Sequence, residues 1–259
     1  MPALLEAKII RCSVVVALTT APALEKLTLS MCHSLRKLPP LPNMKVLDLS
    51  ECHHLDECPE SFPALLDANI RLCHGLVNLP TMPLLNRLSL TDCPVLTLPP
   101  VQNLQYLDLW ECPGLNTFPE SLPSLLDATI YNSPGLIVLP NAPLLEVLKL
   151  YVCDGLRTLH PMPKLELLDL WECHHLDECP ESFPALLDAN IRLCNGLVNL
   201  PAAPLLEQLI LQQCGAIQSL PPLPNLRRLD VTDCGMLTLP PIPSLRDGKY
   251  VERVEEKRP

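Results

Sequence analysis

Glycine, aromatic residues, positive charge and long apolar runs are all scarce in this sequence. Only 8 of its 259 residues are glycine, and the aromatic residues are 3 Phe, 4 Tyr and 2 Trp. So few glycines provide no phosphate-binding loop of the GxxxxGK type. No run of about 18 uncharged apolar residues occurs, so no membrane span is expected. The 29 Asp and Glu outnumber the 19 Lys and Arg, which argues against nucleic acid as the main partner.

Leucine and proline are abundant instead. The chain has 59 leucines and 31 prolines, and 48% of its residues are apolar. That apolar share is too high for an intrinsically disordered chain. Proline lacks a backbone N–H and clashes with the preceding helical turn. A proline at about every eighth residue therefore rules out a conventional helical domain.

The leucines, prolines and cysteines recur in a unit of the form LxxLxLxxCxxLxxLPxxP. Clear copies are LEKLTLSMCHSLRKLPPLP at 24–42, LEVLKLYVCDGLRTLHPMP at 145–163 and LEQLILQQCGAIQSLPPLP at 206–224. A fixed period of this length is typical of repeat proteins. Twelve units of 19–21 residues account for residues 1–242. We expect a repeat array over 1–242, followed by a C-terminal stub and charged tail over 243–259.

The LxL alternation within each unit, as in Leu27-Thr28-Leu29, predicts a short strand with two leucines inward. One unit cannot bury its apolar face alone, so neighbouring units must stack. The predicted fold is a repeat solenoid with a parallel β-sheet on its concave face. The proline pairs predict an extended convex side with little α-helix.

These motifs resemble those of leucine-rich repeat proteins over residues 2–242. The unit ending in LPxLP is most similar to the short repeats of bacterial effectors of the YopM and IpaH type. Cysteine replaces the asparagine of those repeats, as in the repeats of plant immune receptors. The resemblance implies a right-handed superhelix that binds proteins, and a virulence effector delivered into a host cell without a cleaved signal peptide.

Thirteen cysteines, an odd number, predict free thiols and a cytoplasmic or other reducing compartment. Eleven units carry the cysteine at the same place, and Ser133 replaces it in the other. We expect these residues, together with Cys58 and Cys179, to be buried in the core. The CHHLDEC segments at 52–58 and 173–179 contain zinc-ligand residue types. Their cysteines point inward while their histidines lie on loops, so we expect no metal, no cofactor and no enzymatic activity.

Aromatic residues gather in one column of the predicted sheet. Trp110, Tyr131, Tyr151 and Trp171 occupy the last outward position of four consecutive strands, and Tyr106 lies on the same face. Cross-strand packing would explain contacts between them, but not why outward positions are aromatic. Exposed Trp and Tyr are typical of interaction sites. We therefore predict that a partner protein binds here.

Acidic residues surround this column in the predicted sheet: Asp108, Glu111, Asp127, Asp169 and Glu172. Carboxylates beside aromatic rings favour a basic segment that carries Arg or Lys. The terminal units have no clear polar caps, which leaves a monomer and an end-to-end dimer both open.

Three other functions remain open at this point. Residues 51–80 and 172–201 are identical except for His74 against Asn195, which favours an isolated or artificially assembled array with no ligand of its own. The resemblance also allows the substrate-recognition half of a ubiquitin-ligase effector without its catalytic domain. The aromatic column could alternatively bind a glycan.

Overall fold

The computed structural model describes residues 4–235, 237–238 and 249–253, and these residues form strands, turns and extended chain without a helix. They divide into two compact units. Unit 1 comprises residues 1–125 and 131–135, and unit 2 comprises residues 126–130 and 136–259.

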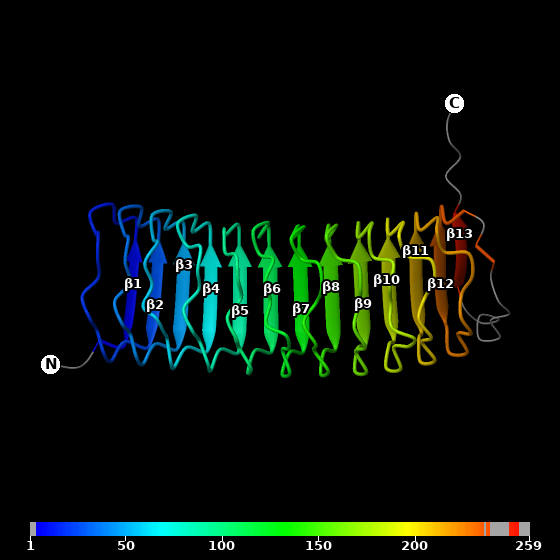
Figure 1. The fold of residues 1–259 in the computed structure, drawn as a ribbon, viewed down its shortest axis with the longest axis horizontal. Coiled ribbons are helices and arrows are strands. Elements are labelled where there is room, and N and C mark those ends of the chain that lie inside the picture. Colours follow the sequence, from blue (N-terminus) through cyan, green and yellow to red (C-terminus); the bar gives the residue numbers. More distant parts are fainter. Residues whose placement is uncertain (1–3, 236, 239–248, 254–259) are drawn as a thin grey trace, which may run out of the picture. The chain divides into compact units, whose positions relative to one another are not determined.

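Unit 1 contains a parallel sheet whose strands follow the order of the sequence (Figure 1). Consecutive strands pair residue for residue at an offset of one repeat, as in Leu27 with Leu47. The strands are β1 (Glu6–Ile10), β2 (Lys26–Ser30), β3 (Val46–Ser50), β4 (Asp67–Arg71), β5 (Arg87–Thr91) and β6 (Tyr106–Trp110).

Unit 2 repeats this arrangement with six parallel strands in sequence order. They are β8 (Val147–Tyr151), β9 (Leu167–Trp171), β10 (Asp188–Arg192), β11 (Gln208–Gln212), β12 (Arg228–Thr232) and β13 (Lys249–Arg253). Strand β7 (Asp127–Tyr131) contributes its first four residues to unit 2 and Tyr131 to unit 1. Strand β13 belongs to the tail expected over 243–259, and the rest of that tail lies outside the described residues.

In β2 to β6 of unit 1, in β7 and in β8 to β12 of unit 2, the second and fourth residues of each strand form the core, while the first, third and fifth lie on what we call the outer face. In β1 the second and fourth residues are only half-buried. Leu27 and Leu29 in β2, for example, are each 1% exposed. On the other side of each repeat, single parallel bridges join the proline-rich stretches, as between Lys37 and Glu57 or Thr158 and Glu178. The predicted solenoid of parallel strands with extended proline-rich segments is confirmed.

The repeated cysteines are buried beneath the turns that follow the strands, except Cys12, which is half-buried. The Cys52 Sγ lies 3.6 Å from the Ser50 carbonyl oxygen and 3.9 Å from that of Leu29. Ser133 is also fully buried and donates to the Tyr131 carbonyl. Each cysteine therefore packs as a small residue with a weak donor.

The expectation that Cys58 and Cys179 are buried in the core is wrong, because both are half-buried. Side-chain length is not the cause, because Leu79 at an equivalent position is also half-buried, whereas Leu38 is fully buried. The same position in the repeat is therefore covered to different depths in different repeats. The surroundings of the two thiols still have a strong effect. Burial raises the pKa of both to about 12.

The residue that follows each of the first twelve strands has a left-handed backbone, with φ between 49° and 55°, although none of these residues is glycine. The N–H of Met31, for example, donates to the Ser50 carbonyl at the end of the neighbouring strand at 2.9 Å, and the N–H groups of Arg11, Glu51, Leu72, Asp92, Glu111, Val152, Glu172, Leu193 and Gln213 donate in the same way. The left-handed residues are Arg11, Met31, Glu51, Leu72, Asp92, Glu111, Asn132, Val152, Glu172, Leu193, Gln213 and Asp233. A residue with a Cβ is disfavoured in this conformation by about 1–2 kcal/mol.

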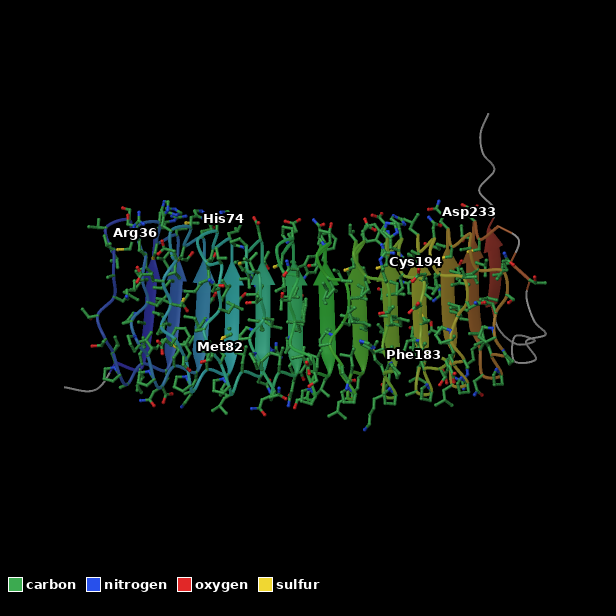
Figure 2. All side chains as sticks on the ribbon, in the orientation of Figure 1. Arg36, His74, Met82, Phe183, Cys194 and Asp233 are labelled. Atoms are coloured by element: carbon green, nitrogen blue, oxygen red, sulfur yellow. The ribbon has the colours of Figure 1, made fainter. Side chains whose placement is uncertain are left out.

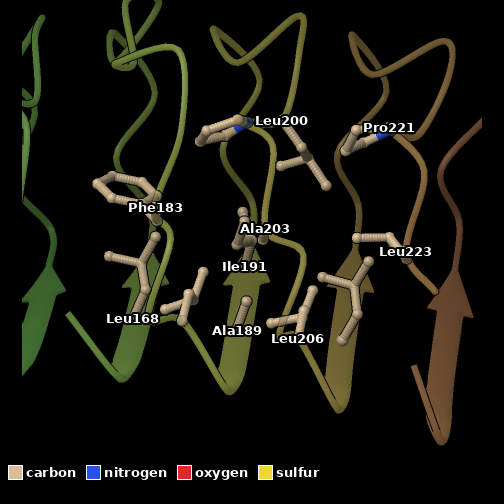
Figure 3. Close-up of a pocket in the computed structure, with 12 residues that line it drawn as sticks. Leu168, Phe183, Ala189, Ile191, Leu200, Ala203, Leu206, Pro221 and Leu223 are labelled. Carbon is tan, nitrogen blue, oxygen red and sulfur yellow. The ribbon is translucent and has the colours of Figure 1, made fainter. Parts of the chain in front are cut away.

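The core of unit 2 contains a small apolar cavity of about 20 Å³. Figure 3 shows Phe183, Ala189, Ala203 and Leu206 around it. The cavity arises because Ala189 and Ala203 are smaller than the Leu, Ile, Phe and Pro side chains that form the rest of its wall. The cavity has about the size of one water molecule, so it is a packing defect rather than a ligand site.

Candidate binding surface

The predicted aromatic residues lie on the outer face. Trp110 and Trp171 end their strands and are each 39% exposed. Tyr106 begins β6 and is 37% exposed, whereas Tyr131 and Tyr151 are half-buried. Strand alternation directs these side chains away from the leucine core.

In unit 1 the indole of Trp110 stacks on the ring of Tyr131, with centroids 5.0 Å apart and an interplanar angle of 28°. The Trp110 Nε1 donates a hydrogen bond to Asp108. The guanidinium of Arg87 lies 4.6 Å above the centre of the Tyr106 ring, which is a cation–π contact. Both aromatic side chains of β6 are thus held in place by polar neighbours.

In unit 2 the rings of Tyr151 and Trp171 meet edge to face, with centroids 6.3 Å apart at 67°. The Tyr151 hydroxyl donates to Asp169 at 2.8 Å. The pKa of Tyr151 is raised to about 12. Burial is the largest cause, followed by the hydrogen bond to Asp169 and the negative charge of Asp169. The phenol therefore stays protonated and holds its ring against Asp169.

The acidic residues predicted around the rings have different environments. Asp108 accepts from Trp110, and Asp169 accepts from Tyr151, so both carboxylates orient rings within the protein. Asp127 begins β7 on the outer face. Glu111 and Glu172 follow β6 and β9 as left-handed residues, the first exposed and the second half-buried.

The structure brings the aromatic residues together as two pairs, one in each unit. The pair in unit 1 is Trp110 with Tyr131, and the pair in unit 2 is Tyr151 with Trp171. The continuous row of four rings, and binding by any of these residues, stay predictions.

A polar chain that was not predicted from the sequence lies on the outer face next to Trp171. In unit 2, Asn190 donates to Asp169 at 3.0 Å, and Arg192 Nε donates to the Asn190 Oδ1 at 2.9 Å. Unit 1 has the equivalent chain from Arg71 through Asn69 to Asp48, at 3.0 and 3.3 Å. The alternation within each strand directs these side chains outward, as it does the aromatic residues. The repeated DANIR segment, which contains the Asn and the Arg at its outward positions, could have indicated the polar chain.

A pocket of about 400 Å³ opens beside Trp171 in unit 2 and was also missed. Figure 2 shows Asp233 at the edge of the sheet where the strands end, with Phe183 at the opposite edge. The pocket is lined by Trp171, Arg192, Leu193, Gln212, Gln213, Thr232 and Asp233.

The histidines of the first CHHLDEC segment lie on the turns of unit 1. The ring of His53 stacks between those of His33 and His74, at centroid distances of 5.1 and 4.9 Å. The His53 Nδ1 lies 2.8 Å from the Leu72 carbonyl oxygen. Across residues 4–235, 237–238 and 249–253, no three His, Cys, Asp or Glu side chains are grouped so as to hold a metal ion.

Comparison with known proteins identifies the type of repeat. Residues 103–125 match the family model of the leucine-rich repeat, and no curated protein matches the chain. A crystal structure of a leucine-rich repeat protein from Bacteroides ovatus is similar with a TM-score of 0.50 at 14% identity, covering 95% of this chain and 83% of that one. The solenoid is therefore of the leucine-rich-repeat type, a fold that is typically non-catalytic.

Two further bacterial structures are similar at lower TM-scores. A leucine-rich repeat protein from Leptospira interrogans gives 0.25 at 18% identity, covering 89% of this chain and 79% of that one. YopM from Yersinia enterocolitica gives 0.22 at 18% identity, covering 97% and 91%. In the part of the chain that the structure describes, no helix has the length and apolar character needed to cross a membrane.

Proposed function

We propose that this protein is a non-enzymatic scaffold whose outer sheet face binds a segment of a partner protein. The observation that carries the proposal is the exposure of both tryptophans of the chain. Trp110 and Trp171 are each 39% exposed on the outer face, and each contacts a tyrosine. Exposed Trp and Tyr are the residues that most often dominate binding energy at protein interfaces.

The proposed partner segment is basic. The cation–π contact between Arg87 and Tyr106 demonstrates, within the protein, how a guanidinium packs on an outer-face ring. A partner Arg or Lys would make the same contact with the exposed Trp110 or Trp171. The net charge of −10 would attract such a segment over longer distances and speed association at low salt.

Two of the predicted acidic residues support this function indirectly. Asp108 and Asp169 fix the orientations of Trp110 and Tyr151, so the rings are held in place before a partner arrives. Asp127, Glu111 and Glu172 would supply the carboxylates that select a basic partner. An aromatic surface that is already ordered loses less entropy on binding.

The narrower form of the proposal is an effector-like scaffold that works in a reducing compartment. Its support is the LPxLP repeat motif and the thirteen free thiols. The second candidate is an array with no ligand of its own, which the near-identity of residues 51–80 and 172–201 favours. The two candidates differ in whether the exposed tryptophans contribute to any binding.

Selection from a random peptide library displayed on phage tests the proposal. We expect the selected peptides to be enriched in Arg and Lys. Trp110→Ala or Trp171→Ala should weaken their binding by about 2 kcal/mol, or roughly 30-fold, as for interface hot spots. Thr91→Ala is the control, because Thr91 pairs with Trp110 across the sheet and ends its strand in the same way. Equal affinities for the native protein and both tryptophan variants would contradict the proposal.

A further inference from the structure

The pocket beside Trp171 is built by four consecutive strands of unit 2. Trp171, Arg192, Gln212 and Thr232 are the last residues of β9, β10, β11 and β12. The remaining lining residues, Leu193, Gln213 and Asp233, are the left-handed residues that follow three of these strands. The pocket is therefore a product of the recurring turn, and its volume of about 400 Å³ falls in the range of small-molecule sites.

The lining combines an aromatic surface with groups that both donate and accept hydrogen bonds. Trp171 supplies an exposed indole, Gln212 and Gln213 supply carboxamides, and Thr232 supplies a hydroxyl. The guanidinium of Arg192 and the carboxylate of Asp233 are the two formal charges of the lining. Because these charges have opposite sign, a cationic or an anionic group would be attracted by one and repelled by the other. The lining therefore favours an uncharged ligand.

The polar wall of the pocket is organised before a ligand binds. The Arg192 Nε donates to the Asn190 Oδ1 at 2.9 Å, so the terminal guanidinium nitrogens remain as further donors. Asn190 is anchored in turn on Asp169, which also holds the hydroxyl of Tyr151. Tyr151 packs against Trp171. One chain of contacts thus fixes both the guanidinium and the indole, which lowers the entropy lost on binding.

Unit 1 contains the same polar chain without the pocket residues, so a comparison of the two units shows which residues belong to the site. The chain from Arg71 through Asn69 to Asp48 is the same. Its register partners differ, because Ser50 stands where unit 2 has Trp171, and Thr91 stands where it has Gln212. The polar chain therefore occurs without an indole or a carboxamide beside it. The added indole and carboxamide, which the polar chain does not require, are the residues that suit a ligand.

We propose that this pocket binds a neutral saccharide, with a pyranose ring stacked on Trp171 and its hydroxyls bonded to Gln212, Gln213, Thr232 and Arg192. A pyranose has an apolar C–H face for the indole. Each of its hydroxyls both donates and accepts a hydrogen bond, as do the carboxamides and the hydroxyl of the pocket. This function is separate from the proposed binding of a protein segment and shares only Trp171 with it.

The test is titration of the folded protein with a panel of neutral mono- and disaccharides, including maltose, cellobiose, lactose and chitobiose, followed by saturation-transfer NMR and calorimetry. We expect saturable binding of at least one of them with a dissociation constant of about 1 mM or tighter. In a Trp110→Phe background, the fluorescence of Trp171 should change with the same constant. No saturable binding up to about 100 mM of any sugar would overturn the proposal.

Variants locate the site. Gln212→Ala should weaken saccharide binding about tenfold, and Trp171→Ala should abolish it, while Trp171→Phe retains part of it. Gln208→Ala is the matched control, because Gln208 is an exposed outer-face residue at the start of the same strand and does not line the pocket. Equal losses in Gln208→Ala and Gln212→Ala would overturn the site.

Peptide binding distinguishes this proposal from the general function. Gln212→Ala should leave the affinity for selected basic peptides unchanged. A variant that loses sugar binding but keeps peptide binding therefore locates the sugar in the pocket. A different outcome would overturn the saccharide proposal. If the protein binds no sugar but binds a peptide, and both Trp171 and Gln212 are required for that binding, the occupant of the pocket is a protein segment.

Discussion

Replacing Glu111 by glycine should stabilise the protein, although the change removes a side chain. Glu111 has φ of 53°, in the left-handed region where a Cβ approaches the following carbonyl oxygen. Its side chain is exposed, so its removal costs little packing. Its N–H donates to the Tyr131 carbonyl at 2.9 Å, and glycine keeps that bond.

The size of the effect follows from two opposing contributions. Removing the Cβ relieves about 1–2 kcal/mol of left-handed strain. Glycine also increases the conformational entropy of the unfolded chain, which costs about 0.4–1 kcal/mol. The difference is a gain of about 0.5–1 kcal/mol in the free energy of unfolding, equivalent to about 2 °C in the melting temperature for a chain of this size.

Glu120→Gly is the matched control. Glu120 is exposed, lies in the same repeat, and is not among the residues with positive φ. It should show only the entropic loss, with the same change in net charge. Thermal unfolding followed by circular dichroism should place Glu111→Gly above the native protein and Glu120→Gly below it. If the two variants lower the midpoint equally, the left-handed residues are not strained and the reasoning is refuted.

Three other predictions concern the core, the thiols and Tyr151. Ala203→Val should fill the cavity of about 20 Å³ and raise the free energy of unfolding by about 0.5 kcal/mol, seen as a higher urea midpoint; a lower midpoint would show that the site is already filled. Cys12 should react first with Ellman's reagent at pH 8, and Cys58 slowly, because burial raises the pKa of Cys58 to about 12; a fast phase that survives Cys12→Ser would contradict this. Tyr151 should ionise near pH 12 in an absorbance titration, and lower in Asp169→Asn. The pKa of the Tyr151 hydroxyl is higher in the folded than in the unfolded state. The protonated hydroxyl therefore contributes to the free energy of unfolding below about pH 10, and this contribution should be lost between about pH 10 and 12.

The predictions of buried and outward-facing positions succeeded because they depend on contacts that are local in the sequence or that recur in every repeat. The LxL alternation is sufficient to bury Leu27 and Leu29 and to direct Trp110 and Trp171 outward. The cysteine position is set by the same period. The prediction for Cys58 and Cys179 failed because the period gives a position in the repeat and not how deeply neighbouring repeats cover it. Leu79 is half-buried at an equivalent position where Leu38 is fully buried.

The features that the sequence analysis missed require distances between side chains of different repeats. Whether Asp108 faces a partner or bonds Trp110 depends on side-chain conformation, which no periodicity encodes. The contact between Arg87 and Tyr106 is of the same kind. The pocket beside Trp171 needs four strand ends and three turn residues at once.

The amino-acid pattern by itself determines that this chain forms stacked strands with a leucine core, because period-two alternation and a twenty-residue repeat leave few other ways to bury the leucines. The left-handed turns are decided only by tertiary structure. No glycine marks any of these twelve places. Hydrogen bonds from the turn N–H groups to neighbouring repeats, together with the buried cysteines, hold ordinary residues in a conformation that their own sequence disfavours. Those turns in turn supply part of the wall of the pocket.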